Sequence, residues 1–181
     1  SECPFDLVEK DLMVNVRAVM YLAHQVLPSM RERGRGHIVN IASLAGLGAS
    51  AFYETYVTTK HAVVGFTRGL RASLRTDQTG VSASVICPGF IRDSGMFARK
   101  VESHDNHPPA MMGTSSPEDV AKAVIKAIRK DLPEVLVNPT PMRPFLALQL
   151  LFPRFGQWLA AKLGVNTVSH KAVAADHETP Q

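Results

Sequence analysis

The chain has 181 residues, of which 45% are hydrophobic and 20% are charged. This balance is ordinary for one soluble globular domain and excludes a disordered polymer or a collagen-like repeat. The net charge is +4, but the basic residues are scattered and form no run that would indicate nucleic-acid binding. The two cysteines, Cys3 and Cys87, lie far apart and no signal-peptide pattern is present, so we expect a reducing, cytoplasmic setting.

The first half of the chain predicts two helices and a strand between them. Apolar residues recur at steps of three and four over residues 8–33, which is typical of an amphipathic helix ending at Arg33 and Gly34. The short, β-branched segment 37–43 predicts a strand buried on both faces, as in a parallel sheet. Residues 54–77 again show helical spacing.

The second half continues the alternation of strand and helix. A second strand is expected at 81–87, stopped by Pro88 and Gly89, and a last one at 134–138. Between them, residues 92–115 show no periodicity, and Ser116 is a suitable N-cap for a helix that begins at Pro117. Strands alternating with helices predict an α/β fold with a parallel sheet.

The composition changes after residue 138. Prolines precede an apolar stretch that is too short and too interrupted to span a bilayer. We expect residues 141–166 to form a helical extension packed on its own domain. Docking to a partner, or peripheral membrane contact through 145–163 with Trp158, Arg154 and Lys162 as anchors, stays open as an alternative. Residues 167–181 look like a polar tail.

One tyrosine has the spacing of an acid/base catalyst. Lys60 follows Tyr56 by four residues, so on a helix the two side chains share one face. A neighbouring ammonium favours the phenolate, and we therefore expect Lys60 to lower the pKa of Tyr56 towards the working range. Many helices carry such a pair only for surface packing. Tyr53 is the nearest rival, but Val57 stands where its lysine would be needed.

Ser43 strengthens the case for chemistry, because it stands at the expected C-terminal end of a buried strand. Open α/β sheets bind ligands at this edge, and a serine hydroxyl there can donate to a developing alkoxide or a carbonyl oxygen. His104 and His107 lack the carboxylate or cysteine framework of a metal site, so we predict no metal.

The segments GHIVNIAS-LAG, YVTTK and ICPGF, with Asn15 in MVNVRAV, occur in the order and spacing of a known family. Together they resemble the short single-domain short-chain dehydrogenases/reductases, over roughly residues 5–138. The resemblance implies the C-terminal portion of a Rossmann-type doubly wound parallel sheet, with three α/β/α layers, spanning residues 1–140. It also implies an NAD- or NADP-dependent interconversion of an alcohol and a carbonyl compound.

The resemblance also implies a role for each site residue. Tyr56 would be the general acid/base, Lys60 would lower its pKa and hold the cofactor ribose, and Ser43 would polarise the substrate oxygen. Asn15 would anchor a proton-relay water. The remaining cofactor contacts would be Pro88, Gly89, Ile91 and Ser94, and the substrate wall would include Tyr53, Met96 and Phe97.

The sequence departs from this family in two places. The glycine-rich phosphate turn and the residue that selects NAD or NADP are absent, and Asp93 replaces a threonine common after the Pro-Gly turn, with Ser94 beside it. We therefore expect a fragment of a longer enzyme, in which the strand that ends at Ser43 has a bare edge. The alternative function is a catalytically inactive fragment or interaction module. The expected partners are a small hydrophobic substrate and further copies of the chain, bound through helices 8–33 and 54–77.

Overall fold

The computed structural model describes residues 4–92 and 112–164. The predicted site residues Ser94, Met96 and Phe97, the two loop histidines and the polar tail lie outside the described residues.

The chain begins with one long helical rod. It consists of α1 (Phe5–Leu12), the π-helical segment η1 (Met13–Arg17) and α2 (Ala18–Glu32). The predicted helix 8–33 is confirmed, but its periodicity did not reveal the π-helical turn. Such turns insert one extra residue into a helix and are frequent at functional sites.

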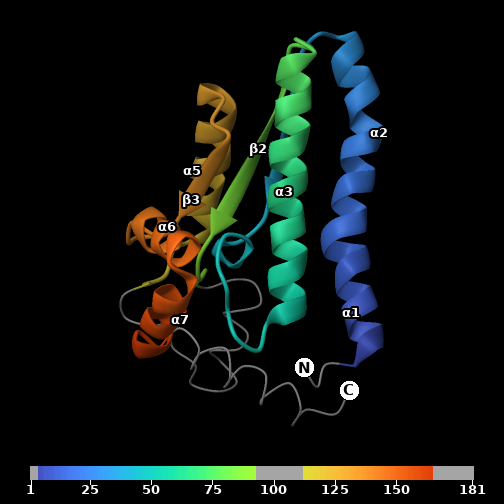
Figure 1. Ribbon diagram of the computed structural model, residues 1–181. Coiled ribbons are helices and arrows are strands. Elements are labelled where there is room, and N and C mark those ends of the chain that lie inside the picture. The colour runs from blue at the N-terminus through green and yellow to red at the C-terminus, as the bar shows by residue number, and fades with distance from the viewer. Residues whose placement is uncertain (1–3, 93–111, 165–181) are drawn as a thin grey trace.

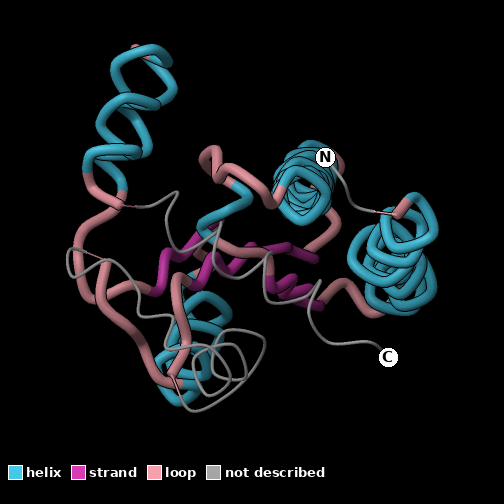
Figure 2. Tube along the Cα trace, turned by 90° about the horizontal axis from the view of Figure 1, so that it is seen from below, coloured by secondary structure: helices cyan, strands magenta, loops and turns pink. Residues whose placement is uncertain are grey.

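Three parallel strands form the sheet, in the order β1–β2–β3. They are β1 (Gly36–Ile41), β2 (Val81–Pro88) and β3 (Glu134–Val137). Helix α3 (Glu54–Thr76) covers one face and α5 (Pro117–Lys130) covers the other (Figure 1; Figure 2). Helix α2 runs beside α3. The predicted three-layer α/β/α arrangement of the Rossmann type is confirmed.

The central strand β2 has side chains packed on both of its faces. Val85 and Cys87 pack with Val63 of α3, whereas Ile86 packs with Ala127 of α5. Alternation along a strand sends successive side chains to opposite faces, and a helix on each face therefore buries them all. This buried strand is the framework from which Pro88 and Gly89 emerge.

Strand β1 differs from the prediction. It was expected to be buried on both faces, but only Ile38 is buried and Ile41 is 44% exposed. The physical reason is its place at the sheet edge: among the described residues β1 pairs with β2 alone, so one of its two hydrogen-bonding edges has no partner strand. The prediction that the strand before Ser43 has an edge without a partner strand is confirmed for the described residues.

Helix α5 begins as its sequence indicated. Ser116 accepts a hydrogen bond from Asp119 N (3.3 Å) while the Asp119 carboxylate accepts from Ser116 N (2.9 Å), a reciprocal capping box.

The apolar stretch after β3 forms two helices, α6 (Arg143–Leu151) and α7 (Pro153–Lys162). Among the helices of the described residues, none has the length and apolar character needed to cross a membrane.

Candidate active site

Ser43 is fixed at the carboxyl end of β1 by the backbone around it. Its hydroxyl accepts a hydrogen bond from Ala45 N (3.2 Å) and donates to Pro88 O (3.4 Å). The neighbouring Ala42 N donates to Ile86 O (2.8 Å), which continues the ladder between β1 and β2. Ser43 is therefore tied to both strands at the edge where open α/β sheets bind ligands.

The turn after Ser43 lies directly against helix α3. This turn, η2 (Leu44–Gly46), contains a glycine for which a Cβ atom would lie 2.6 Å from the backbone oxygen of Lys60. Only a residue without a side chain allows that approach. Gly46 thus sets the spacing between the serine turn and the stretch of α3 that carries Tyr56 and Lys60.

Tyr56 and Lys60 lie one turn apart near the beginning of α3, both partly buried. The Lys60 ammonium lies over the Tyr56 ring, 5.5 Å from its centroid, within the range of a cation–π interaction. The Ser43 side chain lies close enough to Tyr56 to lower the pKa of its phenol. The structure therefore brings together the three side chains that the sequence grouped: Ser43, Tyr56 and Lys60.

Burial controls the ionisation of this group. Desolvation raises the pKa of Tyr56 above its ordinary value, the Ser43 hydrogen bond opposes that rise, and the charge of Asp11 adds to it. Desolvation lowers the pKa of Lys60, and Asp11 opposes that change. Taking either group out of water penalises its charged form.

The predicted direction of the Tyr56 pKa shift is therefore wrong for this structure. Lys60 was expected to lower it, but its ammonium stacks on the ring face, and the pKa of Tyr56 is raised because burial outweighs the favourable interactions. The group that does favour the phenolate is the Ser43 side chain, which lowers the pKa of Tyr56 against the effect of burial.

Pro88 and Gly89 border the same edge. The Pro88 carbonyl accepts from Ser43, and Gly89 N donates to Val137 O (2.9 Å). A Cβ atom on Gly89 would lie 2.4 Å from Asn138 Oδ1, and this oxygen is buried without a hydrogen-bond partner among the described residues. Asn138 was predicted only as the end of a strand, and no sequence pattern marks it as a neighbour of the site.

The other predicted residues occupy less direct positions. Tyr53 stands at the N-cap of α3, with its ring edge-on to Tyr56 at a centroid distance of 6.2 Å. Ile91 forms an isolated bridge with Ser115 just beyond β2. Asn15 lies in the π-helical turn η1, partly buried, and among the described residues no recorded contact joins its side chain to Ser43, Tyr56 or Lys60.

Sequence reasoning missed Asp11. Its charge acts on both Tyr56 and Lys60, across the packing of the α1–η1 rod on α3. The signal available in the sequence was its position four residues before Asn15, on the helix already assigned to the site.

Comparison with known proteins identifies the family. The short chain dehydrogenase family matches residues 1–105, more than half of the chain. The chain belongs to this family.

Two curated proteins similar to the chain are named for different substrates. Ketoacyl reductase HetN of Nostoc sp. is 42% identical over 137 residues, covering 76% of this chain and 46% of HetN. Human retinol dehydrogenase 10 is 35% identical over 138 residues, covering 74% of the chain and 39% of that protein. The chain thus spans less than half the length of these relatives.

Solved short chain dehydrogenases share the fold. A Burkholderia phymatum enzyme in complex with NAD has a TM-score of 0.64 at 25% identity, with 78% of this chain and 57% of that chain covered. ElxO with NADP bound has a TM-score of 0.65 at 22% identity, with 75% and 58% covered. A match to ElxO at this identity supports the fold alone.

Proposed function

We propose that the chain carries the catalytic half of an NAD- or NADP-dependent oxidoreductase that interconverts an alcohol and a ketone or aldehyde. The observation that carries this proposal is the convergence of Ser43, Tyr56 and Lys60 at the carboxyl edge of the sheet. The cofactor class is supported by solved structures at 25% identity that are bound to NADH or NAD. Family membership supports an oxidoreductase.

The described residues fit the nicotinamide end of such a cofactor. No side chain projects from Gly89, because Asn138 fills the space that its Cβ would need. The half-buried ammonium of Lys60 is in no recorded ion pair among the described residues and is available to ribose hydroxyls. A bound nicotinamide would accept or donate the hydride and, in its oxidised form, bring a positive charge.

In this proposal Tyr56 passes a proton between its phenol and the substrate oxygen. Ser43 would turn its single hydroxyl proton from the Pro88 carbonyl to that oxygen, and donate a hydrogen bond as charge develops on it. Lys60 holds the ribose, and its ammonium stabilises negative charge that develops on the phenol. Asn15, in the π-helical turn, anchors a water that relays the proton to solvent.

A hydrophobic substrate suits the surroundings of Ser43. Its neighbour Leu44 belongs to a buried apolar cluster with Met142 and Met112, against which Phe90 and Phe145 pack. Relatives named retinol dehydrogenase point to the same class of compound. We therefore propose an apolar alcohol or carbonyl compound as the substrate.

Turnover of the reduced cofactor, followed by its absorbance with a panel of carbonyl compounds, tests the oxidoreductase. Tyr56→Phe should lower kcat by about 10²–10⁴-fold, the usual contribution of an acid/base group. The matched control Tyr53→Phe removes a hydroxyl from the adjacent ring and should retain most activity. No turnover by the complete enzyme on the panel would favour the inactive interaction module instead.

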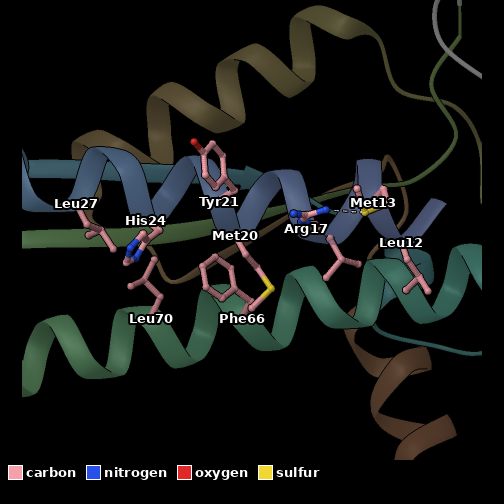
Figure 3. A pocket seen from close by; sticks show the side chains of 10 residues that line it. Leu12, Met13, Arg17, Met20, Tyr21, His24, Leu27, Phe66 and Leu70 are labelled. Carbon is pink, nitrogen blue, oxygen red and sulfur yellow. Dashed lines mark hydrogen bonds between the residues drawn. The ribbon is translucent and has the colours of Figure 1, made fainter. Parts of the chain in front are cut away.

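We also propose that copies of the chain associate through the rod α1–η1–α2 and helix α3. An apolar groove of about 720 Å³ runs between these helices, and Figure 3 shows Met20 and Phe66 meeting within it. The outer surface carries exposed Tyr21 and Leu22. Light scattering should give a dimer or larger that Leu22→Asp dissociates, and a monomer at micromolar concentration would contradict this interface.

For localisation we propose the cytoplasm. Cys87 is a buried free thiol, which suits a reducing compartment. Burial raises its pKa to about 12, so the thiol is unreactive and takes no part in the proposed chemistry.

A further inference from the structure

The hairpin formed by α6 and α7 exposes a run of large apolar side chains. Leu150, Leu151 and Phe152 at the junction of the two helices are 83%, 70% and 60% exposed. Phe155 and Trp158 continue this surface along α7, with ring centroids 5.5 Å apart. We name these five residues the hairpin tip. Scattered exposed apolar residues are normal, but a contiguous group of this size marks an interaction surface.

The hairpin is built so that the tip faces outward. A Cβ atom on Gly156 would lie 2.6 Å from Gln149 Cα, so α7 is in close backbone contact with α6 at this point. Gly156 and Ala160 are buried, one turn apart, on the inner side of α7. The small residues therefore fill the interface, and the larger Phe155 and Trp158 are left on the outer side.

The charge around the tip has one sign. No Asp or Glu occurs from residue 135 to residue 164. Arg154 and Lys162 lie four residues before and after Trp158, on the same helical stripe. Both are exposed and, within the described part of the chain, neither is in a recorded ion pair. Aromatic rings flanked by unpaired cations are the composition of a helix that lies in the interface of an anionic membrane.

Pairing of another strand with the free edge of β1 does not account for this surface. Strands that join the bare edge of β1 extend the sheet away from β3. The hairpin follows β3 and lies on the opposite side of the molecule from α1 and α2 (Figure 1). A strand added at that edge therefore leaves the tip uncovered.

We propose that the α6–α7 hairpin docks the protein peripherally on an anionic phospholipid membrane. The tip enters the boundary between headgroups and acyl chains, and Arg154 and Lys162 contact the headgroups. Docking places the proposed active site near the bilayer, because α6 packs on the loop after Ser43. A Cβ atom on Gly48 would lie 2.7 Å from Gln149 Oε1. The docking itself does not depend on the proposed oxidoreductase activity.

The chain carries its own probe, since Trp158 is its single tryptophan and lies in the tip. Titration with phosphatidylcholine vesicles that contain phosphatidylserine should shift its emission to the blue and make the protein sediment with the vesicles. Pure phosphatidylcholine should bind more weakly, and salt should reduce the difference.

Matched variants locate the contact. Phe152→Ser should weaken binding to the anionic vesicles roughly tenfold, as expected for one large apolar side chain. Phe5→Ser removes a phenylalanine on α1 that is more exposed than Phe152, at 74% against 60%, and should leave binding unchanged. Arg154→Gln should weaken anionic binding about fivefold and leave binding to neutral vesicles unaltered.

Three results would overturn the proposal. These are an emission spectrum unchanged by anionic vesicles, equal binding to both vesicle types, or equal effects of Phe5→Ser and Phe152→Ser. A blue shift produced by raising the protein concentration without lipid would also overturn it, because it assigns the tip to a second copy of the chain. All these readouts are independent of turnover, so failure of docking is distinguishable from failure of the proposed function.

Discussion

The two ends of helix α3 each hold a cation away from solvent, and they do so in opposite ways. Near its C-terminal end, Arg71 is 7% exposed and donates to Ser82 Oγ (2.7 Å), Ala83 O (2.9 Å) and the side chain and backbone oxygens of Asp131 (2.7 Å each). Near the beginning of the helix, Lys60 is partly buried, and within residues 4–92 and 112–164 only the Tyr56 ring is in contact with its ammonium.

This difference separates a structural cation from a functional one. Arg71 has exchanged its water for a full set of acceptors and joins α3 to the sheet and to the end of α5. Lys60 has lost water without an equal set of acceptors, and its pKa is lowered as a result. A buried cation left in this condition costs stability and marks a place where a ligand completes the interactions.

Exchanging each cation for an apolar residue should give the largest effects and tests whether Lys60 and Arg71 have different roles. Lys60→Met should lower turnover about 10²-fold, in line with loss of an acid/base partner, and leave the melting temperature unchanged or higher. The reason is that a desolvated charge is removed while no recorded hydrogen bond is lost. Steady-state kinetics and thermal unfolding of the same preparation measure both effects.

Arg71→Met should do the reverse. Loss of the guanidinium leaves buried acceptors unsatisfied and should lower the free energy of unfolding by about 2–3 kcal/mol. Turnover per folded molecule should remain near that of the unaltered protein. Equal losses of stability from Lys60→Met and Arg71→Met would contradict the assignment of different roles.

Two glycine variants test whether the close approach of the serine turn to the backbone of Lys60 is needed for stability and activity. Gly46→Ala should destabilise by about 1–3 kcal/mol, the usual cost of overpacking, and reduce kcat by displacing the serine turn from Lys60. Gly65→Ala is the control, because nothing lies within 4 Å of its added methyl group. It should be neutral or stabilise the helix by up to about 1 kcal/mol. Denaturant unfolding of both variants provides the measurement.

The smallest expected effect is on the stability of the protein at acid pH, through Asp131 beside the C-terminal end of α3. The Arg71 hydrogen bond holds the pKa of Asp131 below its ordinary value of 3.8. A depressed folded-state pKa contributes stability that is present above the ordinary value and is lost as pH falls through the folded value. Stability should therefore fall below about pH 4, and Asp131→Asn should reduce that slope. An unaltered slope would show that the carboxylate contributes nothing.

Local patterns were sufficient to predict the elements that carry the chemistry. Periodicity placed the helix 54–77 within one residue of α3, and Ser116 with Pro117 marked the beginning of α5. The spacing of Tyr56 and Lys60 gave their shared face directly. These features depend on residues a few positions apart, which is the range over which a sequence pattern is informative.

Features that depend on distant residues were not predictable. The exposure of β1 depends on which strands flank it, and the Arg71 network joins positions 60 residues apart. The direction of the Tyr56 pKa shift depends on how deeply the phenol is buried, which spacing alone does not reveal. Asp11 and Asn138 stand beside the site because of packing between elements.

The most direct test of the central claim is a titration of the Tyr56 phenol by NMR, with ¹³C-labelled tyrosine and Tyr56→Phe for assignment. Ser43→Ala removes a hydrogen bond that favours the phenolate, so the pKa of Tyr56 should rise further. Asp11→Asn removes a negative charge that disfavours the phenolate, so the pKa should fall. Opposite shifts are the result that this account predicts. A Tyr56 pKa that neither substitution moves would show that these groups do not act on one another.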